Sequence, residues 1–432
     1  MGRQSRRVRQ DLSFIDRGLK SITLNMIIRQ YKFGILIAIA FTLLLYSCNE
    51  KPTDISYNML SDTLDIVHTN SFERELIKKS ESVYTHQRIF NAGAILIGNY
   101  EEFNSFNFMR FETMPDSLSY LTPDDIDSVV VTMYPGRYAL GDTLSNYIGF
   151  DVYQVDHYWT NITTLDTIYE DPTGKPYLTD RLVGSWEGLI TLKDTLAPIS
   201  FNLDKSLFSE WLQLQPDTNA AVVNWGIAFM PKENCTSIQQ FRAYQSTEIA
   251  TETTLKAFFT NKDGEKDTVS FIAAINKSFP SAPEPEEGQL IMQAGVRYNT
   301  NFDIDLTSIP DLSGIHLARL ELWLDSESST IGNMGVDSLF HISVDLDDET
   351  TLSSVGALDR ASGLYTFYDM VLPIEWTLRN GKEQTLSVSF VSYNELARQM
   401  DRIVFFGMNA ADTSKRPKLE LVYSTRPTVC NK

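Results

Sequence analysis

The stretch FDIDLTSIPDLSGIHLARLELWL, residues 302–324, decides the fold. It runs from an alternating segment through a loop with a proline into a second segment, in which Leu320, Leu322 and Leu324 occupy every other position. Alternation with a period of two places successive side chains on opposite faces, as in a half-buried strand of an antiparallel sheet. We therefore predict two β-strands joined by a loop over these residues.

A second stretch, closer to the N-terminus, has the same order of features. Residues 108–133, FMRFETMPDSLSYLTPDDIDSVVVTM, again lead through a proline loop into a strand, in which Val129, Val131 and Met133 take the place of the leucines. Further segments match in the same order: residues 150–155 with 340–344, 226–229 with 387–390, and 255–259 with 419–423. Repetition of this kind predicts two related β-domains in series.

The N-terminal segment predicts export and a lipid anchor. Residues 33–46, FGILIAIAFTLLLY, form an uncharged run of fourteen, whereas a bilayer span needs about 20 residues. A positive flank precedes the run, as in a signal peptide. The run leads into Ser47-Cys48, which resembles the lipobox of bacterial lipoproteins and implies cleavage before Cys48 and acylation of that cysteine. An ordinary signal peptide with an incidental cysteine is the alternative, and Met26 is the predicted start of translation.

The charge of the mature chain excludes one class of partner. Without residues 1–47, which hold eight basic and two acidic residues, 29 basic residues face 54 acidic ones, a net charge of −25. A chain this acidic repels phosphate backbones, so nucleic acid is not an expected partner. By resemblance to lipoprotein sorting signals, Asn49 after the cysteine favours the outer membrane, and the composition resembles that of Bacteroidota surface lipoproteins. We expect contact with the membrane through the lipid anchor only.

The predicted fold class is all-β, with two tandem antiparallel β-sandwich, jelly-roll-like domains, because many short strands are separated by turns. A Pro/Glu-rich stretch, SFPSAPEPEEG at residues 278–288, predicts a stiff linker between the two domains. The predicted divisions are a signal peptide at 1–47, a tether at 48–58, a first sandwich at 59–277 with an insertion at about 160–198, the linker at 278–288, a second sandwich at 289–425 and a tail at 426–432.

Both predicted domains resemble the DNRLRE-type carbohydrate-binding modules of secreted bacterial proteins. The resemblance rests on Phe302-Asp303 leading to Ala318-Arg319-Leu320, on Val152-Tyr153-Gln154-Val155 leading to Trp159, and on the closing Arg416-Pro417-Lys418-Leu419. It covers residues 90–275 and 288–424 and implies a β-sandwich that binds a glycan. The first copy has Thr253-Thr254-Leu255 in place of the closing Arg-Pro motif, and the second has no tryptophan after its valine strand.

No catalytic motif is found in the sequence. Gly184-Ser185-Trp186-Glu187-Gly188 has its serine one place too early for a nucleophile elbow, and the five histidines form no H-E-x-x-H pattern. We therefore predict a protein that is not an enzyme. No cofactor is expected except a possible structural calcium ion. Asp345, Asp347 and Asp348 follow a strand and offer the hard oxygen ligands that calcium prefers. A solvated acidic loop is the alternative.

Aromatic side chains are the predicted ligand contacts, because sugar faces stack on flat rings. Tyr158, Trp159 and Trp186 border the insertion, and Trp323 lies on the strand face opposite the leucines. Local packing is the alternative for Tyr158, Trp159 and Trp186, whereas packing between the two domains is the alternative for Trp323. Trp211 and Trp225 are predicted core residues. An oxidising compartment also allows a disulfide between Cys235 and Cys430.

The sequence thus predicts a non-catalytic cell-surface lipoprotein that binds polysaccharide through β-sandwich modules. The alternative is a structural or adhesin-type protein, or a subunit of an envelope complex, whose partner is another envelope protein and which has no glycan affinity.

Overall fold

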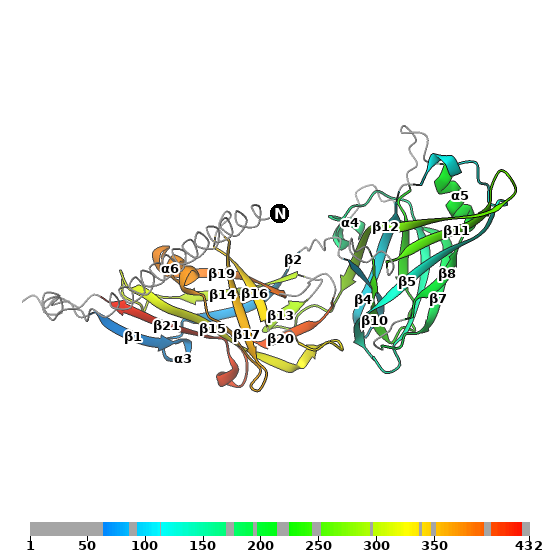
Figure 1. The fold of residues 1–432 in the computed structure, drawn as a ribbon. Helices are drawn as coiled ribbons and strands as arrows, with labels where there is room; N and C mark the ends of the chain where they lie inside the picture. The colour runs from blue at the N-terminus through cyan, green and yellow to red at the C-terminus, as the bar shows by residue number, and fades with distance from the viewer. Residues whose placement is uncertain are drawn as a thin grey trace, which may run out of the picture. The chain divides into compact units, whose positions relative to one another are not determined.

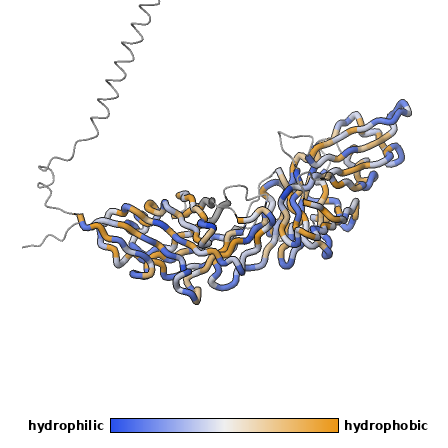
Figure 2. Tube along the Cα trace, turned by 60° about the horizontal axis from the view of Figure 1, so that its bottom comes forward, coloured by the Kyte–Doolittle hydropathy of each residue, from blue (hydrophilic) through white to orange (hydrophobic). Residues whose placement is uncertain are grey.

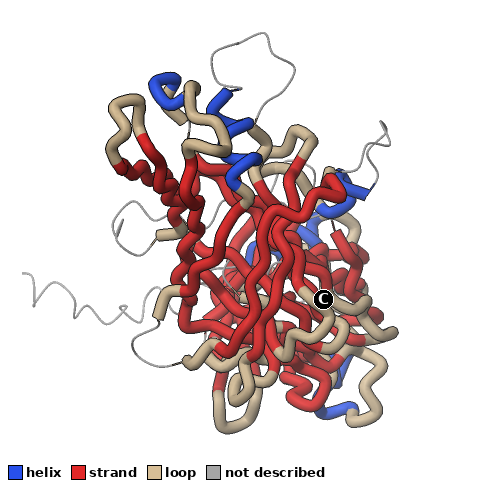
Figure 3. Tube along the Cα trace, turned by 90° about the vertical axis from the view of Figure 1, so that its right-hand side faces the viewer, coloured by secondary structure: helices blue, strands red, loops and turns tan. Residues whose placement is uncertain are grey.

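The computed structural model describes residues 64–85, 93–112, 114–169, 177–192, 197–213, 224–243, 252–293, 297–336, 339–346, 351–392 and 399–425. Over these ranges the chain forms two antiparallel β-sandwiches, built on a ten-stranded and an eleven-stranded hydrogen-bonded network. The predicted all-β sandwich class is confirmed. Residues 65–425 form one compact unit, and Figures 1 and 3 show strands throughout it, with the helices short and peripheral.

The first sandwich takes its ten strands from one continuous segment. Their order is β12-β11-β5-β10-β3-β4-β9-β6-β7, with β8 beside β5 and an additional ladder between β12 and β4. The strands are β3 (Ala94–Tyr100), β4 (Phe103–Phe111), β5 (Ile126–Gly141), β6 (Tyr147–Val155), β7 (Leu178–Leu189), β8 (Ile199–Leu203), β9 (Ile227–Pro231), β10 (Ser237–Arg242), β11 (Thr254–Thr260) and β12 (Lys266–Ser281). The helices are η1 (Asp116–Leu118), α4 (Leu165–Tyr169) and α5 (Lys205–Gln213).

The second sandwich takes its strands from both ends of the compact unit. Its order is β1-β21-β15-β18-β17-β16-β19-β14-β2, with β20 pairing β13 and β15. The strands are β1 (Asp65–Asn70), β2 (Ile77–Thr85), β13 (Gln289–Gln293), β14 (Arg297–Asp305), β15 (Gly314–Thr330), β16 (Leu339–Asp345), β17 (Thr351–Asp359), β18 (Leu364–Phe367), β19 (Glu383–Ser392), β20 (Arg402–Phe406) and β21 (Lys418–Thr425). The helices are α3 (Ser71–Arg74), α6 (Val371–Arg379) and η3 (Thr413–Lys415).

The structure corrects the predicted start of the first sandwich. β1 pairs with β21 and β2 pairs with β14, so residues 65–85 belong to the second sandwich, although the sequence placed them in the first. Figure 1 shows these blue strands beside strands from the C-terminal half. Alternation identifies a strand and its buried face, but it carries no information about which sheet edge the strand joins.

The predicted linker and insertion also change. β12 continues to Ser281, so the first residues of the predicted linker are strand, and Phe279 is buried there. The region predicted as an insertion contains β7, which pairs with β6 from Tyr147–Leu189 to Val155–Leu178. The twelve residues of β7 within this segment are therefore part of the sheet.

The cores follow from the alternation. Val129, Val131 and Met133 lie in the core of the first sandwich, whereas Leu320 and Leu322 lie in the core of the second. Figure 2 shows hydrophobic and hydrophilic residues alternating along the strands. Burying one face of each strand is the main source of stability in such a fold. No helix within the described ranges is long and apolar enough to cross a membrane.

A buried hydrogen-bond network links residues of the two sandwiches. The Tyr138 hydroxyl donates to Asp401 Oδ1 over 3.0 Å and accepts from the backbone N–H of Met400 over 2.8 Å. The backbone N–H of Gly332 also donates to Asp401 Oδ1, over 2.7 Å. Burial and the neighbouring Asp401 charge raise the pKa of Tyr138, so its hydroxyl remains a donor.

Candidate functional site

Trp159, one of the predicted ligand contacts, is a core residue. It is 1% exposed, its Nε1 donates to the backbone oxygen of Trp225 over 2.6 Å, and its ring meets Phe108 edge-on at 5.7 Å. A side chain enclosed in this way has no free face for a sugar. The expectation that Trp159 contacts a ligand is therefore corrected: it is a core residue, whereas its neighbour Tyr158 is 60% exposed.

The other predicted aromatic contacts lie at separate places. Tyr158 meets Trp225 edge-on at 5.1 Å, and the half-buried Trp186 packs against Phe150 with ring centroids 5.8 Å apart. Trp323 is half-buried on β15 of the second sandwich, opposite Leu364. Among the described residues no ring contact joins any two of these aromatics, so they do not form a single stacking platform.

The remaining predicted sites are only partly covered. Asp345 is described and accepts a hydrogen bond from the Thr351 hydroxyl over 2.9 Å, whereas Asp347 and Asp348 lie outside the described residues. Within the described ranges no group of three or more His, Cys, Asp or Glu side chains is placed to hold a metal ion. Cys235 carries a free thiol that donates to Gly149 O over 3.1 Å. Cys48 and Cys430 lie outside the described residues, so the lipid attachment and the disulfide stay predictions.

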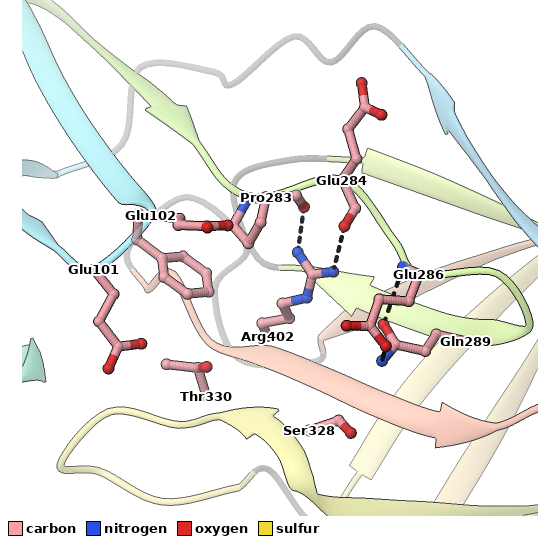
Figure 4. Close-up of a pocket in the computed structure, with 10 residues that line it drawn as sticks. Glu101, Glu102, Pro283, Glu284, Glu286, Gln289, Ser328, Thr330 and Arg402 are labelled. Atoms are coloured by element: carbon pink, nitrogen blue, oxygen red, sulfur yellow. Dashed lines mark hydrogen bonds between the residues drawn. The ribbon is translucent and has the colours of Figure 1, made fainter.

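The structure reveals a polar pocket that the sequence did not predict. Its volume is about 680 Å³, within the range of about 300–1,000 Å³ common for small-molecule sites. The β3–β4 turn, the segment between β12 and β13, the end of β15 and the start of β20 surround it, as Figure 4 shows. It is lined by Glu101, Glu102, Phe103, Pro283, Glu284, Glu286, Gln289, Ser328, Thr330 and Arg402.

Arg402 organises one wall of the pocket. It begins β20, where it pairs with Gln293 of β13 and Thr330 of β15, and it is 5% exposed. Its guanidinium donates to the backbone oxygens of Pro283 and of Glu284, the latter over 3.3 Å, which ties the segment before β13 to the sheet (Figure 4). Burial lowers the pKa of Arg402, although the guanidinium keeps its charge at any physiological pH.

The opposite wall is a strained turn. Tyr100 pairs with Phe103 across a two-residue connection, which places the Glu101 carboxylate at the pocket. Glu101 has a φ of +51°, in the left-handed region that residues other than glycine rarely adopt. A two-residue hairpin of type I′ or II′ requires a positive φ at this position, and a residue other than glycine adopts it at a cost on the order of 1–3 kcal/mol.

The pocket's chemistry is that of a hydrogen-bonding site with an excess of negative charge. Four glutamates surround one arginine, whose donors already serve backbone oxygens, and Glu286 and Gln289 bond each other through the Gln289 Nε2–Glu286 Oε2 contact of 3.3 Å. Carboxylates accept hydrogen bonds, whereas the hydroxyls of Ser328 and Thr330 both donate and accept. The excess of carboxylates repels anionic ligands. Neutral polyhydroxylated ligands can hydrogen-bond to this lining, and cationic ligands can form ion pairs with it.

The sequence carried only an indirect signal of this pocket. The adjacent Glu101 and Glu102 and the Pro/Glu-rich stretch after β12 contribute its carboxylates, but they lie far apart in the chain. The pocket also needs Arg402, which lies more than a hundred residues beyond the Pro/Glu-rich stretch. No local sequence pattern links these three segments of the chain.

Comparisons with known proteins add little. No family model and no curated protein matches the chain. Seven solved chains do. One described as "BspA_C_WT" is 7% identical, with 77% of this chain and 86% of that chain covered and a TM-score of 0.15. Another, the Streptococcus agalactiae AgI/II polypeptide BspA C-terminal domain, is 8% identical, with 84% and 90% covered and a TM-score of 0.14. Values this low leave function to be argued from this chain alone.

Proposed function

We propose that this protein is a non-catalytic, lipid-anchored protein of the outer membrane surface that binds polysaccharide, and that the pocket beside Arg402 holds a neutral or amino-bearing sugar unit. One observation carries the proposal: glutamates, an amide and hydroxyls make up most of the pocket lining, with Phe103 and Pro283 as its apolar members. A ring of hydroxyls can exchange hydrogen bonds with all three kinds of group. The lipid anchor at Cys48 and the Bacteroidota origin rest on the sequence.

The polarity of the pocket distinguishes this ligand from other classes. An apolar molecule would leave the lining carboxylates without partners, and burying an unpaired polar group costs on the order of 1–3 kcal/mol. A phosphate or sulfate ester would meet Glu101, Glu102, Glu284 and Glu286 as like charges. A polyhydroxylated sugar avoids both penalties, and an amino sugar gains an ion pair.

A glycan-array screen of residues 49–432 tests the proposal, with retention of the best ligand measured next. The paired substitutions Glu101→Gln and Glu284→Gln keep the shape of the lining but remove two charged acceptors. Hydrogen bonds to charged groups contribute about 1.5–3 kcal/mol each, so we expect affinity to fall by about tenfold or more. Glu265→Gln, at an exposed hairpin turn away from the pocket, is the matched control and should bind like the parent.

Two results would contradict the proposal in different ways. Unchanged affinity in the paired variant, together with loss of binding in Tyr158→Ala or Trp186→Ala, would move the site to the aromatics near β7. A blank array for the parent protein would overturn glycan binding itself. The alternative function, a structural or adhesin-type protein without glycan affinity, would then be favoured.

A further inference from the structure

The two sandwiches pair most of their equivalent strands in the same pattern. Among the described residues, the β3–β4 ladder is found only in the first sandwich and the β17–β18 ladder only in the second. In the first, β5 lies between β11 and β10; in the second, β15 lies between β21 and β20. β10 pairs β3 as β20 pairs β13, and β4, β9, β6 and β7 follow one another as β14, β19, β16 and β17 do. β8 pairs with β5, and β18 pairs with β15, the equivalent central strand; a helix follows each of them in the chain.

One position in this pattern is filled from different parts of the chain. In the first sandwich, β12 pairs β11 along its first half and β4 along its second, with a register shift between Ala273 and Ile275. In the second, β1 takes the place on β21 and β2 the place on β14, with helix α3 at the bend between them. The β1–β2 segment, residues 65–85, is therefore the counterpart of β12.

Sequence and local contacts support this equivalence. Ile77-Lys78-Lys79-Ser80 of β2 resembles Ile275-Asn276-Lys277-Ser278 of β12. The Ser278 hydroxyl accepts the Leu96 N–H of β3 over 3.0 Å. A similar bond, from the Ile291 N–H of β13 over 2.9 Å, goes to the Ser82 hydroxyl, two residues beyond the serine that matches Ser278 in sequence. Both strands also directly precede the first strand of a repeat, because β2 precedes β3 and β12 precedes β13. Each repeat thus begins with a strand that completes the sandwich of the other repeat.

We infer that the chain consists of two repeats that exchange their first strands, and we propose that a second copy of this chain can supply residues 65–85 to the sandwich built on residues 289–425. Exchange of identical elements preserves every contact and changes only connectivity, so its cost is low. β12 is joined to described strands at both ends. The β1–β2 segment is joined to a described strand at one end only, where residues 86–92 lead to β3.

The acceptor surface has features that select this strand. Leu76 and Ile77 are fully buried in the second core, and the Ser71 hydroxyl accepts the Leu419 N–H over 2.7 Å. Lys78 Nζ lies 2.6 Å from Asp305 Oδ2 and 2.9 Å from Glu383 Oε1. Its hydrogen bond lowers the pKa of Asp305 to about 2. Burial of these apolar side chains supplies affinity. The two carboxylates that bind Lys78 fix the register in which β2 pairs with the acceptor strand.

Register-specific cross-linking of two tagged copies tests the proposal. In residues 49–432 with Cys235→Ser and Cys430→Ser, one copy carries Lys79→Cys and the other Asp303→Cys, two positions directly opposite each other in the β2–β14 ladder. The copies are unfolded together, refolded at high concentration and oxidised. We expect a covalent dimer that carries both tags, with about tenfold more product than when Glu327→Cys of β15 replaces Asp303→Cys.

Folding is monitored in the same experiment. A single copy with both Lys79→Cys and Asp303→Cys should form an intramolecular bridge as a monomer, and its failure to do so would overturn the β2–β14 pairing itself. If that bridge forms but the mixed copies give only monomers, or no more dimer than the Glu327→Cys control, exchange between molecules is wrong.

Discussion

The indole of Trp159 contacts Phe108 and donates to the backbone of Trp225, whereas its neighbour Tyr158 is largely exposed. The sequence placed both beside a predicted binding loop and could not separate them, because adjacent aromatics outside a clear alternation give no sign of which faces inward. Leu320 and Leu322 were predictable as core, since strict alternation determines the buried face. Arg402 was not, because its role depends on backbone oxygens more than a hundred residues away.

The contrast between Trp159 and Tyr158 gives a prediction at this scale. Trp159→Ala should lower the free energy of unfolding by about 3–5 kcal/mol, the usual cost of removing a buried aromatic ring. Tyr158→Ala, at an exposed position, should change it by less than about 1 kcal/mol. Urea unfolding followed by circular dichroism measures both. Similar small losses in the two variants would mean that Trp159 is not part of the core.

Individual elements were the most predictable level of the structure. The alternating segments that hold Val129, Val131 and Met133 and that hold Leu320 and Leu322 form strands β5 and β15 as predicted, because period-two alternation specifies a strand and its buried face. The partners of β1 and β2 were not predictable, since any strand with one apolar face suits several sheet edges. The pocket was not predictable for the same reason, because it forms only where elements from both repeats lie next to each other.

Two glycines test how closely the elements approach. Gly226 and Gly264 both have positive φ angles, +87° and +77°, but a Cβ at Gly226 would lie 2.0 Å from Met109 O, whereas one at Gly264 would meet nothing within 4 Å. Gly264→Ala should cost on the order of 1 kcal/mol from backbone conformation alone. Gly226→Ala should cost clearly more, because β9 must move away from β4. Equal losses in thermal or urea unfolding would contradict the close approach.

For the whole molecule, strand exchange predicts cooperative unfolding. Each sandwich contains a strand, β12 in the first and β2 in the second, that continues along the chain into the other sandwich, and the Tyr138–Asp401 network adds buried contacts between them. We therefore expect one calorimetric transition for residues 49–432, with calorimetric and van't Hoff enthalpies in agreement. Two resolved transitions would show that the sandwiches unfold independently. Tyr138→Phe, which removes only a hydroxyl, should lower the transition temperature without dividing the transition.

The placement of β1 and β2 also determines the order in which the fold can be completed during synthesis. Residues 65–85 leave the ribosome before the rest of the compact unit, yet their partners β14 and β21 follow more than two hundred and three hundred residues later. At about 5–20 residues per second, the wait lasts tens of seconds. During this time the segment, which includes the apolar residues Leu76 and Ile77, has no native partner. We therefore expect a holdase chaperone to bind it.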